Sequence, residues 1–340
     1  MPARPGARNL ITDVPGLKVG QAQDSRARTG VTVILPEAAA VGACDVRGGG
    51  PGTRETDALA PENLVDAVDA VVLSGGSVYG LAAADAVAAW LGARGRGYGP
   101  LRAPGVPASP IVPSAILYDL ANGGDKSWDL EPPYRALGLA AIEAAGAAFE
   151  LGTAGAGYGA MAGTLKGGTG SASIVTDDGY TVGAVACVNS FGAAVAPGSR
   201  AFWAAPYERD GEFGGLGSAG LKADPEDWGG AKANPGARQN TTIACVATDA
   251  ALTPAQAKRL AIMAQDGLAR ALRPAHAPFD GDVVFALATG RVPLADPPQR
   301  TLARLGSLAA DALARAIARG VYEARPWGPE GPLCWRDLTG

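Results

Sequence analysis

Five segments of the chain are apolar at almost every position, and glycine, proline or charged residues bound each of them. Apolar residues at both odd and even positions predict strands that are buried on both faces. Such strands lie between a second sheet on one side and a layer of helices on the other. The pattern therefore predicts an α/β protein with layered sheets. The five segments are residues 31–36, 69–74, 180–189, 242–249 and 282–290.

Three other segments repeat their apolar residues with the period of an α-helix. Two of them follow a serine or a threonine, whose hydroxyl can accept a hydrogen bond from the free N–H groups of a first helical turn. Glycine near position 95 marks the expected end of the first helix. The expected helices are residues 79–95 after Ser77, 253–272 after Thr253 with Pro254 in its first turn, and 300–324.

The charge balance excludes a general nucleic-acid binder. The 340 residues include 29 Lys and Arg against 33 Asp and Glu, a net charge of −4, whereas phosphate binding calls for a basic surplus. Hydrophobic residues make up 47% and charged residues 18% of the chain, which excludes a disordered protein. No apolar run approaches the ~18 residues of a membrane span, and the first residues lack the apolar stretch of a signal peptide. We expect a cytoplasmic protein with no membrane partner.

Histidine occurs once, as His276. A Ser–His–Asp triad would have to use it, and a site with several histidine ligands cannot form within one chain. His276 lies in a proline-rich loop, where we do not expect a chemical role. The four cysteines lie far apart with no C-x-x-C pair, so we expect reduced, buried thiols. We expect no metal and no organic cofactor, and a catalytic base other than histidine.

A long segment of low periodicity, residues 197–239, ends where a β-branched strand begins at Asn240, Thr241 and Thr242. Segments of this length without periodic structure are usually functional or linkers. A threonine hydroxyl can act without histidine when the residue is N-terminal, because its own α-amine then serves as the base. Such an amine titrates at about pH 7.7–8.0. An internal Thr241 would need a cut of the peptide bond before it; the alternative is a threonine that only favours a strand.

Two glycine-rich segments are further candidates. In Ser74–Gly80 a strand leads through Ser-Gly-Gly-Ser towards a helix, a shape that either cradles an anion or makes a tight turn. In Gly152–Ser173, Gly155-x-Gly157-x-x-Ala160 resembles a dinucleotide fingerprint only loosely, since more glycines stand where a helix should begin. The same segment carries Lys166, either a partly buried cation or a solvated loop residue.

Two carboxylates stand at the entrance of the last strand. Asp280 and Asp282 are two residues apart, so an extended chain would direct both to one side. Paired carboxylates can orient an ammonium group and raise a neighbouring pKa. The alternative is a turn with two solvated acids.

Together these segments resemble the self-processing N-terminal-nucleophile amidases, the family of the D-aminopeptidases, the β-peptidyl aminopeptidases and the 6-aminohexanoate (nylon) oligomer endo-hydrolases. The resemblance covers nearly the whole chain and rests on the order and spacing of its motifs. These are ITDVPGLKVGQAQ, GVTVILP, DVRGGGPGTRETDAL, VVLSGGSVYGL, the glycine-rich lysine segment, VACVNSFG, NTTIACVATDA and FDGDVVFALAT.

The resemblance implies a four-layer αββα sandwich with two mixed sheets between helix layers. It implies one domain over residues 1–340, made as a precursor that cuts itself between Asn240 and Thr241. The large chain would then be residues 1–240 and the small chain residues 241–340. The two chains would stay associated, and the heterodimers would assemble into a homo-oligomer such as a tetramer.

The resemblance also implies the roles of individual residues. Thr241 would be the nucleophile and its freed amine the base, while Asp280 and Asp282 would orient both. The other implied site residues are Asn189 as an oxyanion-hole or orienting amide, Lys166 near the nucleophile, Tyr118 lining the site, and the turn Gly75, Gly76 and Ser77 lining the pocket.

Two branches of the family differ at these points. Asn-Thr at the cut and Asp-x-Asp are similar to the nylon-oligomer branch, whereas the LKGGTGSAS stretch is more similar to the aminopeptidases. The implied function is hydrolysis of linear amides, such as 6-aminohexanoate oligomers or short peptides, through an acyl-enzyme. The alternatives are an aminopeptidase for β- or D-amino-acid peptides, acyl transfer like that of the ornithine acetyltransferases, and an uncleaved binding protein.

Overall fold

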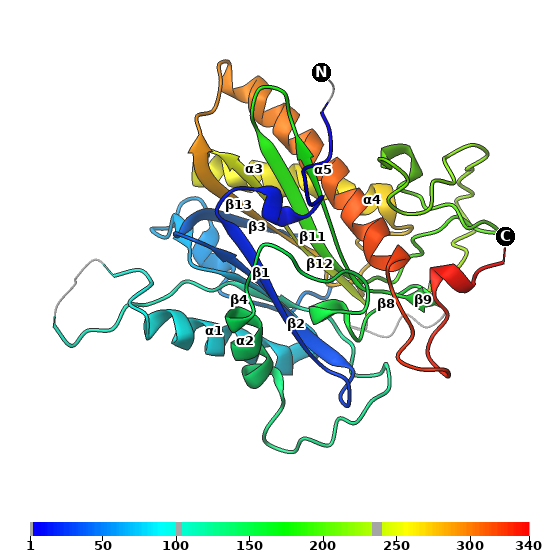
Figure 1. The fold of residues 1–340 in the computed structure, drawn as a ribbon, viewed down its shortest axis with the longest axis horizontal. Coiled ribbons are helices and arrows are strands. Elements are labelled where there is room, and N and C mark those ends of the chain that lie inside the picture. Colours follow the sequence, from blue (N-terminus) through cyan, green and yellow to red (C-terminus); the bar gives the residue numbers. More distant parts are fainter. Residues whose placement is uncertain (1–2, 100–103, 233–239, 340) are drawn as a thin grey trace.

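Two β-sheets stack face to face between two layers of helices (Figure 1). The computed structural model describes residues 3–99, 104–232 and 240–339. The expected four-layer αββα arrangement is confirmed, with one sheet of five strands and another of six.

The five-stranded sheet mixes strand directions, because β6 and β7 run parallel while the other neighbours are antiparallel. Its order is β1 (Leu17–Asp24), β2 (Thr29–Pro36), β6 (Val71–Ser74), β7 (Ser114–Ile116) and β4 (Thr53–Arg54).

The six-stranded sheet is also mixed, since only β12 and β13 run parallel. Its order is β10 (Thr169–Val175), β11 (Thr181–Asn189), β12 (Thr241–Ala250), β13 (Val283–Val292), β3 (Ala40–Val46) and β5 (Ala67–Val68). A separate hairpin joins β8 (Met161–Ala162) and β9 (Leu165–Lys166).

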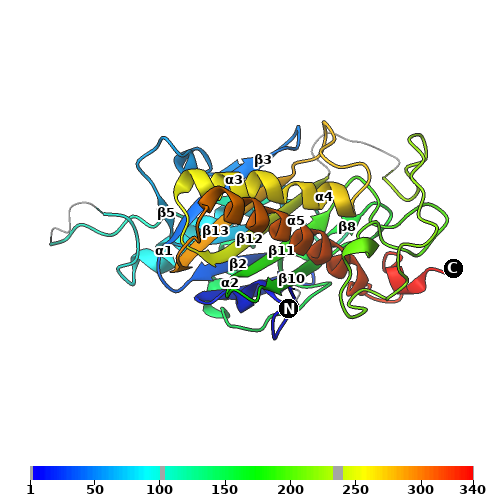
Figure 2. The same ribbon diagram turned by 90° about the horizontal axis from the view of Figure 1, so that it is seen from above.

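Helices cover the outer face of each sheet (Figures 1 and 2). The five-stranded sheet packs against α1 (Ala82–Gly92) and α2 (Tyr134–Glu143), and the six-stranded sheet against α3 (Pro254–Ala264) and α5 (Pro298–Tyr322). In the same helix layer, α4 (Asp266–Ala271) packs against α5 and α3. Short 3-10 helices are η1 (Ile11–Asp13), η2 (Asp57–Leu59), η3 (Ser77–Leu81), η4 (Gly155–Gly157), η5 (Ala205–Tyr207) and η6 (Trp335–Asp337). Among the described residues, no helix combines the length and the apolar character that crossing a bilayer requires.

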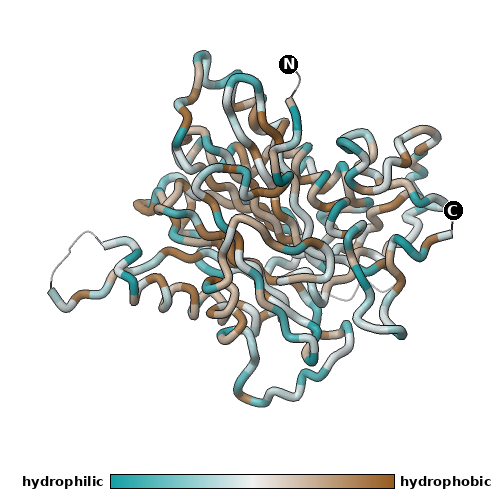
Figure 3. The backbone as a smooth tube through the Cα atoms, viewed as in Figure 1, coloured by the Kyte–Doolittle hydropathy of each residue, from teal (hydrophilic) through white to brown (hydrophobic). Residues whose placement is uncertain are grey.

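Strand alternation divides the interior into three apolar layers. Hydrophobic stretches run through the middle of the molecule, whereas the outlying loops are mostly hydrophilic (Figure 3). Along β12, Ile243 and Cys245 lie between the two sheets, whereas Ala244 and Val246 lie under the helices. This alternation explains why the strand is apolar at every position. It also places Thr241, two residues before Ile243, on the side that faces the other sheet.

All five predicted strands and all three predicted helical segments are present, with two differences. The turn after β6 opens on the 3-10 helix η3, with Gly76 before its first residue, so Ser77 is not the N-cap that we expected. The helix predicted over residues 253–272 is interrupted at Gln265 and forms α3 and α4. Thr253 does cap α3, because its hydroxyl accepts a hydrogen bond from the Gln256 N–H. All four cysteines are buried and free, as expected.

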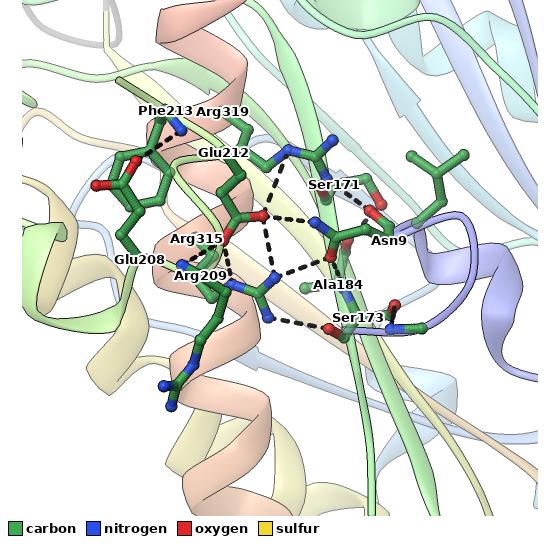
Figure 4. A network of polar contacts seen from close by, with 12 residues as sticks. Asn9, Ser171, Ser173, Ala184, Glu208, Arg209, Glu212, Phe213, Arg315 and Arg319 are labelled. Atoms are coloured by element: carbon green, nitrogen blue, oxygen red, sulfur yellow. Dashed lines mark hydrogen bonds and ion pairs between the residues drawn. The ribbon is translucent and has the colours of Figure 1, made fainter. Parts of the chain in front are cut away.

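A buried network ties the long segment after β11 to α5 (Figure 4). The Arg315 guanidinium, 1% exposed, binds both carboxylate oxygens of Glu212 at 2.5 and 3.0 Å. It also donates to the Ser173 carbonyl and to Asn9 Oδ1, each at 2.9 Å. Asn9 Nδ2 donates to Glu212 in turn, at 2.6 Å. This bidentate pair fixes the middle of a segment whose later residues reach the site described below.

Replacing Arg315 with methionine should lower the free energy of unfolding by about 3–5 kcal/mol, because the Glu212 carboxylate stays buried without its main partner. The matched control is Arg304→Met on the same helix, which removes an exposed pair with Asp178 and should cost about 1 kcal/mol or less. Urea denaturation followed by circular dichroism measures both. Equal losses in the two variants would contradict the structural role of Arg315.

Candidate active site

The strand directions bring three sequence-distant residues to one edge of the six-stranded sheet. β11 is antiparallel to β12, so its last residue, Asn189, lies opposite the first residue of β12, Thr241. β13 is parallel to β12, so its start lies at the same edge, with Asp280 paired to Asn240. The resulting group is almost fully buried: Asn189 is 0%, Thr241 3% and Asp280 2% exposed.

The Thr241 hydroxyl contacts the peptide group that precedes it. Its Oγ donates a hydrogen bond to the carbonyl oxygen of Asn240. The same oxygen accepts a second hydrogen bond, from the backbone N–H of Gly281 at 2.9 Å. The carbonyl before Thr241 is therefore polarised by one backbone donor and lies against one hydroxyl.

Asp282 joins the residue after Thr241 to the only histidine of the chain. Its Oδ1 accepts from the backbone N–H of Thr242 at 2.8 Å. Its Oδ2 accepts from the backbone N–H of His276 at 3.1 Å and contacts His276 Nδ1 at 2.9 Å. With 1% exposure, the carboxylate is held by hydrogen bonds in place of water.

Asp280 occupies a site that favours its neutral form. Its two oxygens accept from the backbone N–H groups of Phe191 at 3.3 Å and Ala277 at 3.0 Å. Burial and the charge of the nearby Asp282 raise the pKa of this carboxyl to about 7, while Lys232 acts in the opposite direction. Both residues lie outside β13: Asp280 closes a turn through its N–H on the Ala277 carbonyl, and Asp282 directly precedes the strand. Each carboxylate has its own set of partners.

Lys232, in the segment that leads to Asn240, is the cation of this group. Its Nζ donates to the Asn189 carbonyl at 3.2 Å, and its backbone N–H donates to the Phe191 carbonyl at 3.0 Å. Burial lowers the pKa of this amine to about 7, and the charge of Asp280 acts to raise it. Lys232 and Asp280 can therefore both exchange protons near neutrality.

The Asn189 side chain links the site to the segment that follows β7 of the five-stranded sheet. Its Oδ1 accepts from the Met161 N–H and its Nδ2 donates to the Tyr118 carbonyl, each at 2.9 Å. Tyr118 thus reaches the site through its main chain. The neighbouring Asp119 binds the predicted glycine turn through the Gly76 N–H at 2.8 Å.

That turn, Gly75–Ser77, depends on glycine at its centre. Gly76 has φ +83°, and a Cβ there would overlap the buried ring of Tyr134. Asp119 also accepts from the Thr29 hydroxyl at 2.6 Å, and burial raises its pKa to about 6. The turn, Tyr118 and Asn189 therefore form one connected set.

Lys166 is fully buried, so the solvated-loop interpretation is wrong. Its Nζ donates to the carbonyls of Gly157, Ala160 and Gly167 at 3.2, 3.0 and 2.6 Å and lies 5.1 Å from the Trp327 ring. Burial lowers its pKa to about 7. Lys166 pairs with Met161 across the β8–β9 hairpin, and Met161 is the residue whose N–H donates to Asn189. Its recorded contacts hold this hairpin and do not include Thr241.

The dinucleotide alternative is not supported. Gly155–Gly157 forms the 3-10 helix η4, and the β8–β9 hairpin follows it where a nucleotide-binding helix would have to begin.

Sequence reasoning missed Lys232 and the backbone donor at Gly281, and it set His276 aside. His276 stands six residues before Asp282, and that spacing was one available signal. The glycine run at residues 48–50 was another, because Gly48 brings its backbone so close to Asp282 that a Cβ would lie 2.3 Å from the Asp282 nitrogen.

A cavity of about 350 Å³ lies beside this group. Its wall includes Thr164 and Gly230, which are joined by a hydrogen bond of 2.8 Å between the Thr164 N–H and the Gly230 carbonyl. The described residues that line the cavity do not include Thr241, Asp280 or Asp282. The cavity is therefore a neighbour of the buried group and not its opening.

Comparisons with known proteins agree with this fold. The family model of peptidase family S58 matches residues 9–331. An uncharacterized aminopeptidase of Mycobacterium tuberculosis is 46% identical over 354 residues, covering 97% of this chain and 98% of that protein. A 6-aminohexanoate-oligomer endohydrolase of Kocuria sp. is 30% identical over 331 residues, covering 94% and 85%.

The structure is similar to that of the L-aminopeptidase D-Ala-esterase/amidase of Ochrobactrum anthropi, described as a variant of the Ntn hydrolase fold. The TM-score is 0.70, with 21% identity and coverage of 99% of this chain and 94% of that one. This likeness establishes the fold. The family match and the curated relatives together identify a hydrolase of amides or peptides, and the chain belongs to peptidase family S58.

Proposed function

We propose that this chain hydrolyses linear amides with Thr241 as an N-terminal nucleophile, which it creates by cutting itself between Asn240 and Thr241. One observation carries the proposal: the Thr241 hydroxyl is hydrogen-bonded to the carbonyl of Asn240, at the edge where Asn189, Asp280 and Asp282 meet. A nucleophile held against the bond it attacks has already lost the entropy that an approach from solvent would cost.

Self-cleavage begins with attack of Thr241 Oγ on the Asn240 carbonyl carbon. The oxyanion forms on the oxygen that accepts from the Gly281 N–H at 2.9 Å, a donor that needs no rearrangement. The C–N bond then breaks, the departing amine of Thr241 takes up the proton that the hydroxyl released, and Asn240 becomes an ester on Oγ. Water hydrolyses this ester and leaves the Asn240 carboxylate and a free Thr241.

Turnover on substrate repeats the attack with a new base. The freed α-amine, whose ordinary pKa is about 7.7–8.0, accepts the Oγ proton and passes it to the leaving amine of the substrate. An acyl-enzyme results, and water clears it. We assign Asn189 to the substrate oxyanion, since it lies opposite Thr241. Asp282 orients the nucleophile through the Thr242 N–H, and Asp280 completes the acid pair.

The strand ladder explains how residues 1–240 and 241–340 would stay together after the cut. β12 of the small chain pairs with β11 of the large chain from Asn189–Thr241 to Val182–Thr248. β13 of the small chain pairs with β3 of the large chain. Both ladders lie in the buried interior, so separating the chains would expose it to water.

The substrate class follows from the acyl-enzyme and from the relatives. We propose linear amides, with 6-aminohexanoate oligomers and short peptides as the first to test. The aminopeptidase name of the relative at 46% identity favours peptides cleaved from their amino end as a second candidate. Added amines that divert the acyl-enzyme from water would instead indicate acyl transfer.

Thr241→Val should prevent self-cleavage and lower amide hydrolysis by about a thousandfold or more, because the nucleophile is lost while the strand residue keeps its shape. The matched control is Thr242→Val. The Thr242 hydroxyl is buried and has no hydrogen-bond partner among the described residues, so removing it should leave cleavage intact and should not lower stability. For both variants, denaturing electrophoresis measures self-cleavage and an amide-hydrolysis assay measures activity. A cleaved, active Thr241→Val protein would contradict the proposal.

Asp280→Asn should make stability less sensitive to pH. The pKa of Asp280 is raised to about 7 in the folded chain, so between about pH 4 and 7 the folded state binds more protons than the unfolded state. Stability of the parent chain is then lost as the pH rises through that window, and the asparagine variant lacks this loss. The melting temperatures of both proteins at pH 5 and pH 8, measured in the uncut Thr241→Val background, test this. An equal change of melting temperature between pH 5 and pH 8 in the two proteins would contradict this prediction.

A further inference from the structure

His276 has a backbone conformation that only a defined set of contacts would maintain. Its φ is +57°, in the left-handed region that most side chains other than glycine and asparagine disfavour. This conformation lets the His276 N–H and Nδ1 reach the same atom, Asp282 Oδ2, at 3.1 and 2.9 Å. The strained residue and the buried carboxylate therefore form one unit.

Asp282 connects His276 to the backbone next to the nucleophile. Its other oxygen accepts from the Thr242 N–H at 2.8 Å, and Thr242 follows Thr241 directly. The path from the imidazole to the backbone of the nucleophile therefore contains one carboxylate and two hydrogen bonds. His276 contacts Asp282 Oδ2 twice, through its backbone N–H and through Nδ1. These two contacts set the orientation of the carboxylate.

The surroundings of His276 leave its ring partly in contact with solvent. The side chain is 24% exposed, against 2% for that of Asp282. Other charged groups close to the pair are Asp280, bound to the Ala277 N–H, and Lys232, on the Asn189 carbonyl. Neither is hydrogen-bonded to the imidazole, so Asp282 is the group that the ring orients.

We propose that His276 is a positioning residue of the Thr241 site, whose Nδ1–H holds the Asp282 carboxylate in the orientation that fixes the Thr241–Thr242 backbone. The inference rests on the proposed function, because it gives His276 a part in the same reaction. It corrects the sequence-based expectation that the only histidine has no chemical role.

Two substitutions separate the hydrogen bond from the backbone conformation. Glycine and asparagine both accept a positive φ, but only asparagine places an N–H donor where Nδ1 stands. His276→Gly should lower the rate of self-cleavage and kcat about 10- to 100-fold through misplacement of the nucleophile, with KM unchanged. His276→Asn should restore both rates to near the wild-type values. Equal rates for the two variants, whether both high or both low, would overturn the proposal.

A spectroscopic measurement tests the contact independently of any reaction. Since the chain has one histidine, 15N-histidine labelling gives nitrogen signals that all belong to His276, and their couplings to the ring protons distinguish Nδ1 from Nε2. In the uncut Thr241→Val chain, Asp282→Asn should shift the Nδ1 signal, because the carboxylate that accepts its proton is gone. An unchanged signal would overturn the inference. An unchanged signal with normal self-cleavage of the wild type would leave the proposed function intact, whereas a wild type that never cuts would contradict that function and not the contact.

Discussion

The pairing of β11, β12 and β13 is the constraint on which the rest of the site depends. An antiparallel neighbour on one side of β12 and a parallel neighbour on the other bring the end of one strand and the starts of two others to a single edge. Asn189, Thr241 and the acid pair thereby meet, although more than 50 residues separate the first from the second. Because strand register has a period of two, a slip of one residue in β12 would turn Thr241 away from the other sheet.

Burial at this edge of the sheet determines the protonation of the side chains that lie there. The Asp280 carboxyl and the Lys232 amine are both pushed towards neutral forms, because each leaves water and each meets few opposite charges. Backbone N–H groups replace much of the lost solvation for both carboxylates. The result is a set of proton-exchanging groups around one hydroxyl, with a preorganised donor on the neighbouring carbonyl.

The sequence predicts much of the fold, because strands buried on both faces and the long helix α5 leave strong periodic patterns. It also supplies Thr241, Asp280, Asp282 and Asn189, through motif order. Lys232 could not be predicted: it lies in a segment with no periodicity, and tertiary contacts such as the Arg315–Glu212 pair determine where that segment runs. The role of Lys166 is likewise invisible in its flanking glycines, since they do not show that three carbonyls surround its amine. His276 was set aside because a proline-rich loop gives no indication of which carboxylate it will contact.

The central claim is that Thr241 becomes an N-terminus by self-cleavage. The most direct test is the denatured intact mass of the purified protein, combined with N-terminal sequencing of any fragment. The account predicts two species of 240 and 100 residues, the smaller beginning Thr241-Thr242-Ile243. A single species of 340 residues that stays uncut on prolonged incubation while the protein hydrolyses amides would contradict it.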